Sequence, residues 1–266
     1  MTPSAFVREL FRRNPVLAWT GAAHLVLLGL MLAVAPFDRR EVLGLNPWIK
    51  PAKFAASIAI YVWTLGWLLH YLAERGRRIG VVSGLTAAAM VVEIALITLQ
   101  AARGTTSHYN ESTPLDATIF RAMGLFITIN TGLVLYVLLL FLRGRPPIAP
   151  SYLWGIRLGL ALFLLATLEG FVMTERLAHA VGVADGGPGL PIVNWSTRGG
   201  DLRAAHFVGL HSLQVLPLVG FLLSWREEAD KSLVPVLGVF AAAAAYAGVV
   251  LLLFRQALSG RPLIPL

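Results

Sequence analysis

The stretch TIFRAMGLFITINTGLVLYVLLLFL, residues 118–142, is apolar apart from one arginine, one asparagine and a few hydroxyl side chains. A helix of about 20 apolar residues spans the hydrocarbon core of a bilayer. The run is continuous and does not alternate between apolar and polar positions, which favours a helix over a strand of a membrane barrel. This stretch therefore predicts a transmembrane helix.

Similar runs occur on both sides of it. Each is rich in Leu, Ala, Val and Gly and is bounded by proline, glycine or charged residues, as helix ends are. We expect an all-α, polytopic integral membrane protein, a bundle of about seven transmembrane helices in one domain, residues 1–266. The predicted spans are residues 16–36, 54–72, 79–101, 118–142, 152–176, 205–224 and 233–254.

The composition agrees with a membrane protein. Of the 266 residues, 57% are hydrophobic and only 14% are charged, whereas a soluble domain has about a quarter of its residues charged. The absence of cysteine excludes disulfides, thiolate metal sites and cysteine nucleophiles. The formal charge of +8 is explained by Lys and Arg that flank the spans and meet lipid headgroups, so we expect membrane lipids as partners and no nucleic acid.

The connections between the spans are of two kinds. The N-terminus and residues 73–78, 143–147 and 225–231 are short and basic, whereas residues 37–53, 102–117 and 177–204 are longer and contain aromatic, His, Asn, Gly and Pro residues. Cytoplasmic connections carry an excess of Lys and Arg. We therefore expect a protein of the plasma (inner) membrane with a cytoplasmic N-terminus, an outer C-terminus and the long connections outside.

Several spans contain ionisable or amide side chains, which are costly in hydrocarbon and by default mark a site or a buried pair. Glu93, Gln100 and Arg103 share one helical face by their spacing of seven and three, and Gln214 follows His211 by three. Glu169, in another span, lies at about the same depth in the membrane as His211. The pattern predicts an outward-opening polar pocket. The alternative is that each residue bonds locally to a neighbouring helix.

The segment NWSTRGGDLRAAHFVGLHSLQ, residues 194–214, leads from a Gly-Gly turn into a span. Asp201 is placed to cap the helix that begins at residue 202. Free N–H groups at a helix start, with Arg198 and Arg203 beside them, favour an anion. Lys53 and Arg103 add positive charge from other connections.

Histidines allow two further kinds of site. The candidate metal ligands are His108, His206, His211 and Glu169, but HFVGLH has none of the signature spacings, so a bound metal stays an open alternative. Haem is disfavoured, because no two histidines lie at matching depth on different spans. For His24 we expect a hydrogen bond within the core, with Thr20 one turn earlier.

The leading functional hypothesis is a membrane protein that binds a lipid or a small anionic ligand in an outward-facing polar pocket, with enzyme chemistry left open. In it, His206, His211 and Glu169 supply acid–base or metal-ligand groups. The ligand-binding residues are Lys53, Glu93, Gln100, Arg103, Arg198, Arg203 and Gln214. One alternative is a proton- or ion-coupled transporter that uses Glu93 and Glu169. Another is a non-catalytic subunit or assembly factor of a membrane complex.

Overall fold

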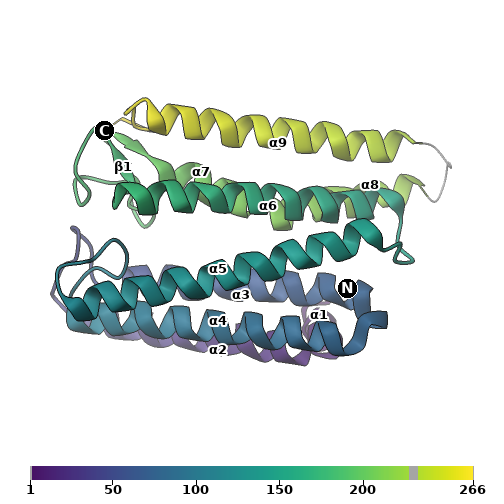
Figure 1. The fold of residues 1–266 in the computed structure, drawn as a ribbon, viewed down its shortest axis with the longest axis horizontal. Coiled ribbons are helices and arrows are strands. Elements are labelled where there is room, and N and C mark those ends of the chain that lie inside the picture. The colour runs from purple at the N-terminus through teal and green to yellow at the C-terminus, as the bar shows by residue number, and fades with distance from the viewer. Residues whose placement is uncertain (1, 228–232, 266) are drawn as a thin grey trace. The chain divides into compact units, whose positions relative to one another are not determined.

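The chain folds into long α-helices, and the computed structural model describes residues 2–227 and 233–265 (Figure 1). Within these residues, seven helical segments are long and apolar enough to cross a membrane. They confirm the seven predicted spans and the all-α polytopic fold. Their bounds are Pro15–Phe37, Ile49–Leu72, Gly76–Arg103, Pro114–Arg143, Pro150–Arg176, Leu202–Trp225 and Val234–Leu258. Part of the predicted connection 225–231 lies outside the described residues.

Two compact units divide the chain, Met1–Leu133 and Val134–Leu266, called unit 1 and unit 2 below. Unit 1 contains α1 (Pro3–Arg13), α2 (Pro15–Val34), η1 (Ala35–Phe37), α3 (Ile49–Leu69), η2 (His70–Arg75), α4 (Gly76–Arg103) and the first part of α5 (Pro114–Arg143). Unit 2 contains the rest of α5, α6 (Pro150–Arg176), β1 (Ala180–Val181), β2 (Gly200–Asp201), α7 (Leu202–Leu210), α8 (Ser212–Glu227) and α9 (Val234–Leu258). The single domain expected from the sequence stays a prediction.

Side-chain caps fix where several helices begin. Thr2 and Asn14 each accept a hydrogen bond from the backbone N–H three residues further along, at the starts of α1 and α2. At the start of α5, Thr113 Oγ1 accepts from the Asp116 N–H at 3.1 Å and donates to the Asp116 carboxylate at 2.5 Å. Such caps satisfy N–H groups that have no partner within the helix.

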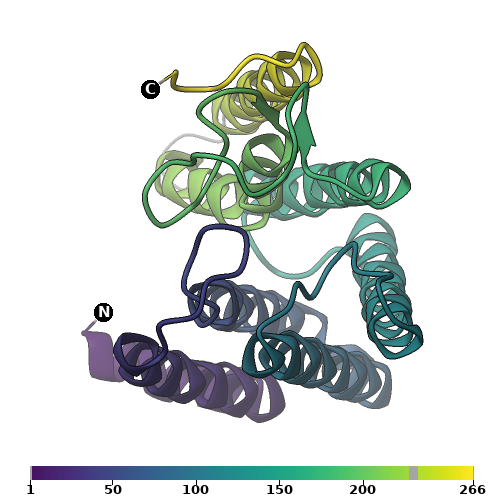
Figure 2. The same cartoon turned by 90° about the vertical axis from the view of Figure 1, so that its left-hand side faces the viewer.

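In unit 1, α3 packs against both α2 and α4, as the end-on view of Figure 2 shows. The Trp63 ring fills the space over Gly21, where a Cβ would lie 2.1 Å from the indole nitrogen. That nitrogen donates to the carbonyl of Ala18 at 3.0 Å. Asn14 Nδ2 donates to Ser83 Oγ at 2.8 Å and joins α2 to α4. Glycine and short polar side chains thus bring the three helices together.

In unit 2, small residues let α6 and α8 approach closely. A Cβ on Gly155 would lie 2.5 Å from the carbonyl oxygen of Leu216, and one on Gly159 would lie 2.8 Å from that of Ser212. Ser212 Oγ also donates to the Gly159 carbonyl at 3.0 Å. Small residues four apart on one helix, with hydrogen bonds across the contact, are typical of helix pairs in membranes.

The sixth span is interrupted between α7 and α8. The N–H of His211 bonds the Val208 carbonyl at 3.1 Å, a contact between residues three apart that is tighter than the α-helical pattern. Tyr246 of α9 donates its hydroxyl to the same carbonyl at 2.6 Å. Pro217 lies further along in α8 and lacks an N–H to donate to the preceding turn. The sequence indicated no such break.

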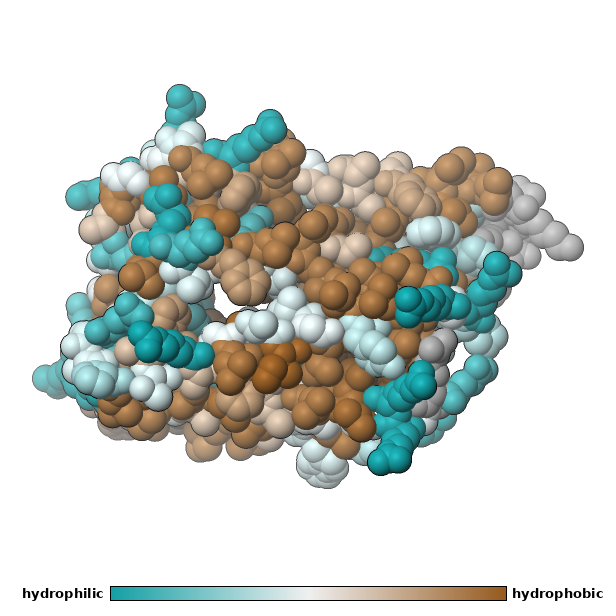
Figure 3. Space-filling view, in the orientation of Figure 1, coloured by the Kyte–Doolittle hydropathy of each residue, from teal (hydrophilic) through white to brown (hydrophobic). Residues whose placement is uncertain are grey.

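The described surface suits contact with lipid. Hydrophobic residues cover the middle stretches of the helices on the face shown in Figure 3, and hydrophilic residues gather at the helix ends. Large apolar side chains such as Leu30, Leu125, Leu165 and Leu252 are more than half exposed. A soluble protein rarely exposes so much apolar surface.

Candidate functional site

The residues that the sequence singles out fall in both units. Unit 1 contains Lys53, Glu93, Gln100, Arg103 and His108, and unit 2 contains Glu169, Arg198, Arg203, His206, His211 and Gln214. The pocket expected from the sequence draws on both sets, and it stays a prediction. Within each unit, these residues form distinct local groups.

At the end of α4, Gln100 and Arg103 bond to the same carboxylate. Arg103 Nη1 lies 2.5 Å from both Gln100 Oε1 and Asp116 Oδ1, and Gln100 Nε2 donates to Asp116 Oδ1 at 2.8 Å. Gln100 and Asp116 are buried. The predicted shared face of Gln100 and Arg103 is therefore observed, but Asp116 balances the charge of Arg103.

Sequence reasoning missed Asp116 as part of this group. The signal was available in the segment TPLD, residues 113–116, because Ser or Thr followed three residues later by an acidic residue predicts a helix start. Asp116 then lies in the first turn of α5, facing the end of α4.

Glu93 lies two helical turns before Gln100 in α4 and is buried, with 5% of its surface exposed. It forms no hydrogen bond with a described residue, and Lys50 acts on it electrostatically. Lys50 acts in the same way on His108, which follows α4 and packs against the rings of Phe54, Tyr109 and Phe120. Lys53, which the sequence predicts to bind the ligand, is half-buried near the start of α3.

In unit 2, His206 of α7 lies against α6 at Ala166 and Gly170. Its Nδ1 is 2.8 Å from the carbonyl of Ala166, so Nδ1 carries a hydrogen and Nε2 of the neutral ring is an acceptor. A Cβ on Gly170 would lie 3.5 Å from His206 Cε1. Ala166, Glu169 and Gly170 share one face of α6. The structure thus brings His206 to the face that carries Glu169.

Glu169 itself is 8% exposed. Its Oε2 is buried and has no hydrogen-bond partner among the described residues. A hydroxyl or amide donor that held Glu169 as a structural link between helices would be expected at this atom. The described residues therefore do not explain Glu169 as a structural link between helices, which makes this carboxylate a candidate functional group.

His211 forms a separate group at the break in the sixth span. Its Nδ1 is 3.2 Å from Gln214 Oε1, and its ring meets the edge of Phe207 at 4.4 Å between centroids. His206 and His211 thus contact different partners, as expected for positions about 140° apart on a helix.

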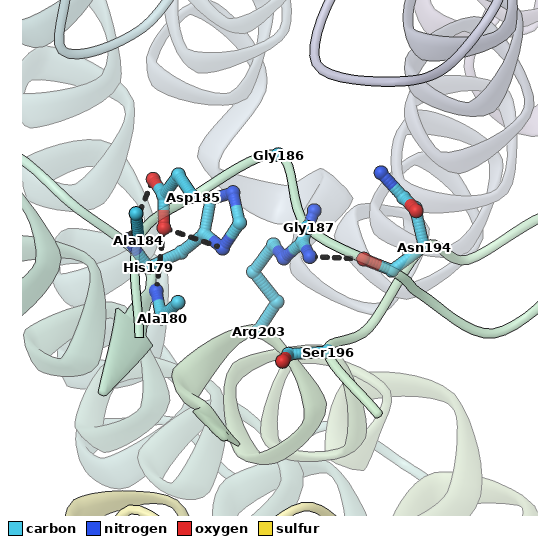
Figure 4. A pocket seen from close by; sticks show the side chains of 9 residues that line it. All are labelled: His179, Ala180, Ala184, Asp185, Gly186, Gly187, Asn194, Ser196 and Arg203. Carbon is cyan, nitrogen blue, oxygen red and sulfur yellow. Dashed lines mark hydrogen bonds and ion pairs between the residues drawn. The ribbon is translucent and has the colours of Figure 1, made fainter. Parts of the chain in front are cut away.

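The connection between α6 and α7 forms a small polar recess over the start of α7 (Figure 4). Arg203 donates to both carboxylate oxygens of Asp201, at 2.9 and 2.6 Å, and to the carbonyl of Asn194. These bonds use Nε and Nη2, and Nη1 has no acceptor among the described residues. His179 Nδ1 lies 3.3 Å from Asp185 and 3.8 Å from Asp201. The recess is open to solvent, and its cavity volume of about 10 Å³ has room for little more than one water molecule.

The predicted cap of α7 is confirmed, since Asp201 accepts from the N–H of Arg203 at 3.1 Å. The chain's own carboxylate therefore occupies this helix start, where the sequence predicts an external anion. Arg198 is exposed, and its guanidinium forms no hydrogen bond or ion pair with a described residue. Of the two arginines predicted to bind an anion, Arg198 has no carboxylate partner among the described residues, and the charge of Arg203 is partly neutralised by Asp201.

No group of three His, Asp or Glu side chains able to hold a metal ion occurs within residues 2–227 and 233–265. The candidate ligands instead make the separate contacts described above. His24 is buried, with Nδ1 2.7 Å from the Thr20 carbonyl, which confirms the expected core hydrogen bond.

Comparison with known proteins gives no relative, because no family model, no curated protein and no solved structure matches the chain.

Proposed function

We propose that the protein binds a lipid or a small anionic ligand where the long connections meet the helices, and that Glu169 and His206 exchange protons with it. The observation that carries the proposal is the buried Glu169 carboxylate, whose Oε2 has no partner among the described residues. Ionisable residues within spans are costly and usually serve a function. His206 of α7, which packs against the face of α6 that carries Glu169, provides a proton acceptor at Nε2.

Two arginines support an anionic group on the ligand. Arg198 is exposed without a carboxylate partner among the described residues, and Arg203 keeps Nη1 available at the recess. A guanidinium binds carboxylate and phosphate through paired N–H donors. Arg103 supports the proposal less, because Asp116 already pairs with it.

Native mass spectrometry of the purified full chain tests this proposal. We expect an adduct that co-purifies with the protein and is lost or reduced at least about tenfold in Arg198→Gln and Glu169→Gln, if each contact contributes about 1.4 kcal/mol. Glu175→Gln is the matched control, because Glu175 is exposed on the same helix. An adduct that persists equally in all three variants, or no adduct in native lipid, contradicts the proposal.

A proton-coupled transporter is the second candidate, and the interrupted sixth span favours it. Discontinuous helices in transporters expose backbone groups that bind ions and substrates near the bilayer midplane. Here the break at His211 lies beside α6, because Gly159 packs on the carbonyl of Ser212 and Gly209 packs on Ala166. Glu169 follows Ala166 by one turn. In unit 1, Glu93 offers a second buried carboxylate.

Proton flux in proteoliposomes tests the transport candidate. An imposed pH gradient should drive flux, reported by an enclosed pH-sensitive dye, that falls to the background of empty liposomes in Glu169→Gln and Glu93→Gln. Glu175→Gln should keep the flux of the unmodified protein. Flux that survives in both variants would exclude this mechanism and leave the binding proposal intact.

We infer further that the N-terminus faces the cytoplasm across an inner membrane and that the C-terminus lies outside. This orientation is supported by exposed arginines at the end of unit 1 where α1 lies, namely Arg8, Arg12, Arg77 and Arg78. Positive charge of this kind is enriched on the cytoplasmic side.

A further inference from the structure

The first helix, α1, is amphipathic. Spacings of three and four place its apolar residues on one side of the helix and its charged residues on the other. The apolar side consists of Phe6, Val7, Leu10 and Phe11. Arg8 and Arg12 are exposed on the charged side, with Glu9 next to them. Helices with this division, rich in arginine, lie in the plane of a membrane interface.

Contacts within unit 1 hold α1 at the start of the first span. Leu10 is 1% exposed, and the Phe6 ring stacks on Trp67 with 5.3 Å between centroids. The Arg13 guanidinium lies 3.8 Å from the centroid of the Trp67 ring. Asn14 has a non-helical backbone, φ −152° and ψ 88°, so the helix is broken between α1 and α2. Because α2 crosses the membrane from Pro15 onward, α1 lies at its boundary.

Apolar side chains remain exposed around α1. Phe6 is 40% exposed, Val7 44% and Trp19 of α2 67%, and the Trp19 ring meets the edge of Phe11 at 5.0 Å between centroids. Tryptophan is enriched where hydrocarbon meets the headgroups. These side chains are therefore suited to the outer part of the acyl region.

The charge of α1 is positive, with three arginines against one glutamate. Hydrogen bonds from Arg12 and Arg13 lower the pKa of Glu9 to about 2, so Glu9 stays ionised at neutral pH and balances one arginine charge. Arg8 forms no ion pair with a described residue. Arg77 and Arg78 are exposed at the start of α4, at the same end of unit 1 (Figure 1). This end therefore complements a negatively charged surface.

We propose that α1 is an interfacial anchor that binds the phosphate groups of anionic phospholipids in the leaflet where α2 begins. Arg8 and Arg12 contact the headgroups, while Val7 and Phe11 reach the acyl chains. Each arginine near an anionic leaflet contributes a factor of about five to binding. The inference is independent of the proposed ligand site, which lies in unit 2.

Lipid selectivity at α1 can be measured in the full chain, because the chain contains no cysteine. Ser4→Cys, an exposed position, would carry a fluorophore in bilayers of phosphatidylcholine that contain a small share of spin-labelled lipid. We expect spin-labelled phosphatidylglycerol to quench it with an apparent affinity at least about fivefold above that of spin-labelled phosphatidylcholine. High salt should reduce the difference.

The double variant Arg8→Gln and Arg12→Gln should bring the two affinities together. Arg121→Gln is the matched control, because Arg121 is an exposed arginine of α5 at the other end of unit 1, and it should leave the preference unchanged. Equal quenching by both lipids in the unmodified chain overturns the proposal. A preference that survives in the double variant also overturns it, because the headgroups would then be bound elsewhere.

Discussion

His108, in the connection between α4 and α5, makes the stability of the fold depend on pH. Its ring is half-buried against Phe54, Tyr109 and Phe120, and Ser107 Oγ lies 3.0 Å from Nδ1. Burial among these rings, and to a lesser degree the charge of Lys50, lowers the pKa of His108 well below its usual value of 6.5. The folded protein therefore holds this imidazole in its neutral form.

The first prediction concerns the acid stability that follows. In the unfolded chain His108 takes up a proton near pH 6.5, whereas the folded protein does so only at lower pH. The unfolded state thus binds more protons below pH 6.5, and stability falls as the pH is lowered, by at most about 1.4 kcal/mol per pH unit. Unfolding titrations in detergent at pH 7 and 5.5 should show a smaller loss for His108→Gln. An equal loss in both proteins would contradict the assignment.

A second prediction concerns the hydrogen bond of Tyr246. Its hydroxyl donates to the Val208 carbonyl at 2.6 Å beside the break in the sixth span. Tyr246→Phe should lower the free energy of unfolding by about 1 kcal/mol, the usual contribution of one hydrogen bond. Tyr136→Phe is the control, because the Tyr136 hydroxyl bonds no described residue. Equal losses in the two variants would show that the bond to Val208 is not responsible.

Among the elements, the contact between α6 and α8 depends most directly on small residues. Gly155→Ala would place a Cβ 2.5 Å from the backbone oxygen of Leu216, which cannot move aside without shifting α8. We expect a loss of about 1–3 kcal/mol, as for other overpacked cores. Gly84→Ala is the matched control, since Gly84 lies within α4 with nothing near its Cβ position. Alanine there should stabilise the helix by about 0.5–1 kcal/mol. Unfolding titrations of both variants measure the difference, and a neutral Gly155→Ala would contradict the tight packing.

The spans were predictable because a bilayer-crossing helix needs only a long apolar run, a property that each segment carries by itself. The ends were less predictable. The span predicted at 54–72 begins at Ile49, because helical hydrogen bonding continues through the polar segment that contains Lys50 and Lys53. The pairing of β1 with β2 was not predicted, since two-residue strands leave no periodic signal.

The sequence signals the helix start that contains Asp116, but it reveals neither the pairing of Asp116 with Gln100 nor the break at His211, for a different physical reason. Both depend on side chains that meet only in the folded chain, such as Tyr246 on the Val208 carbonyl. The spacing of Gln100 and Arg103 placed them correctly on one face, but spacing along α4 could not reveal the Asp116 carboxylate that pairs with them.

Each of the two units contains a buried carboxylate within a span, Glu93 in unit 1 and Glu169 in unit 2. Neither forms a complete set of hydrogen bonds with the described residues. The sequence identified both because a charge in an apolar run stands out. It could not distinguish a functional carboxylate from one that links helices, since that distinction depends on whether a donor lies within reach.

The last prediction concerns topology. If all seven apolar helices of the described residues cross the bilayer, the two ends of the chain lie on opposite sides of the membrane, and the arginines around α1 favour a cytoplasmic N-terminus. In the cysteine-free chain, Thr2→Cys should react with a membrane-impermeant maleimide only in inverted vesicles, and Leu263→Cys only in right-side-out vesicles. The exposed side chains of both residues make them suitable positions. Labelling of both from one side would mean that one of the seven helices does not cross the bilayer. Exchange of the two patterns would keep seven crossings and reverse the orientation, so that the long connections would face the cytoplasm.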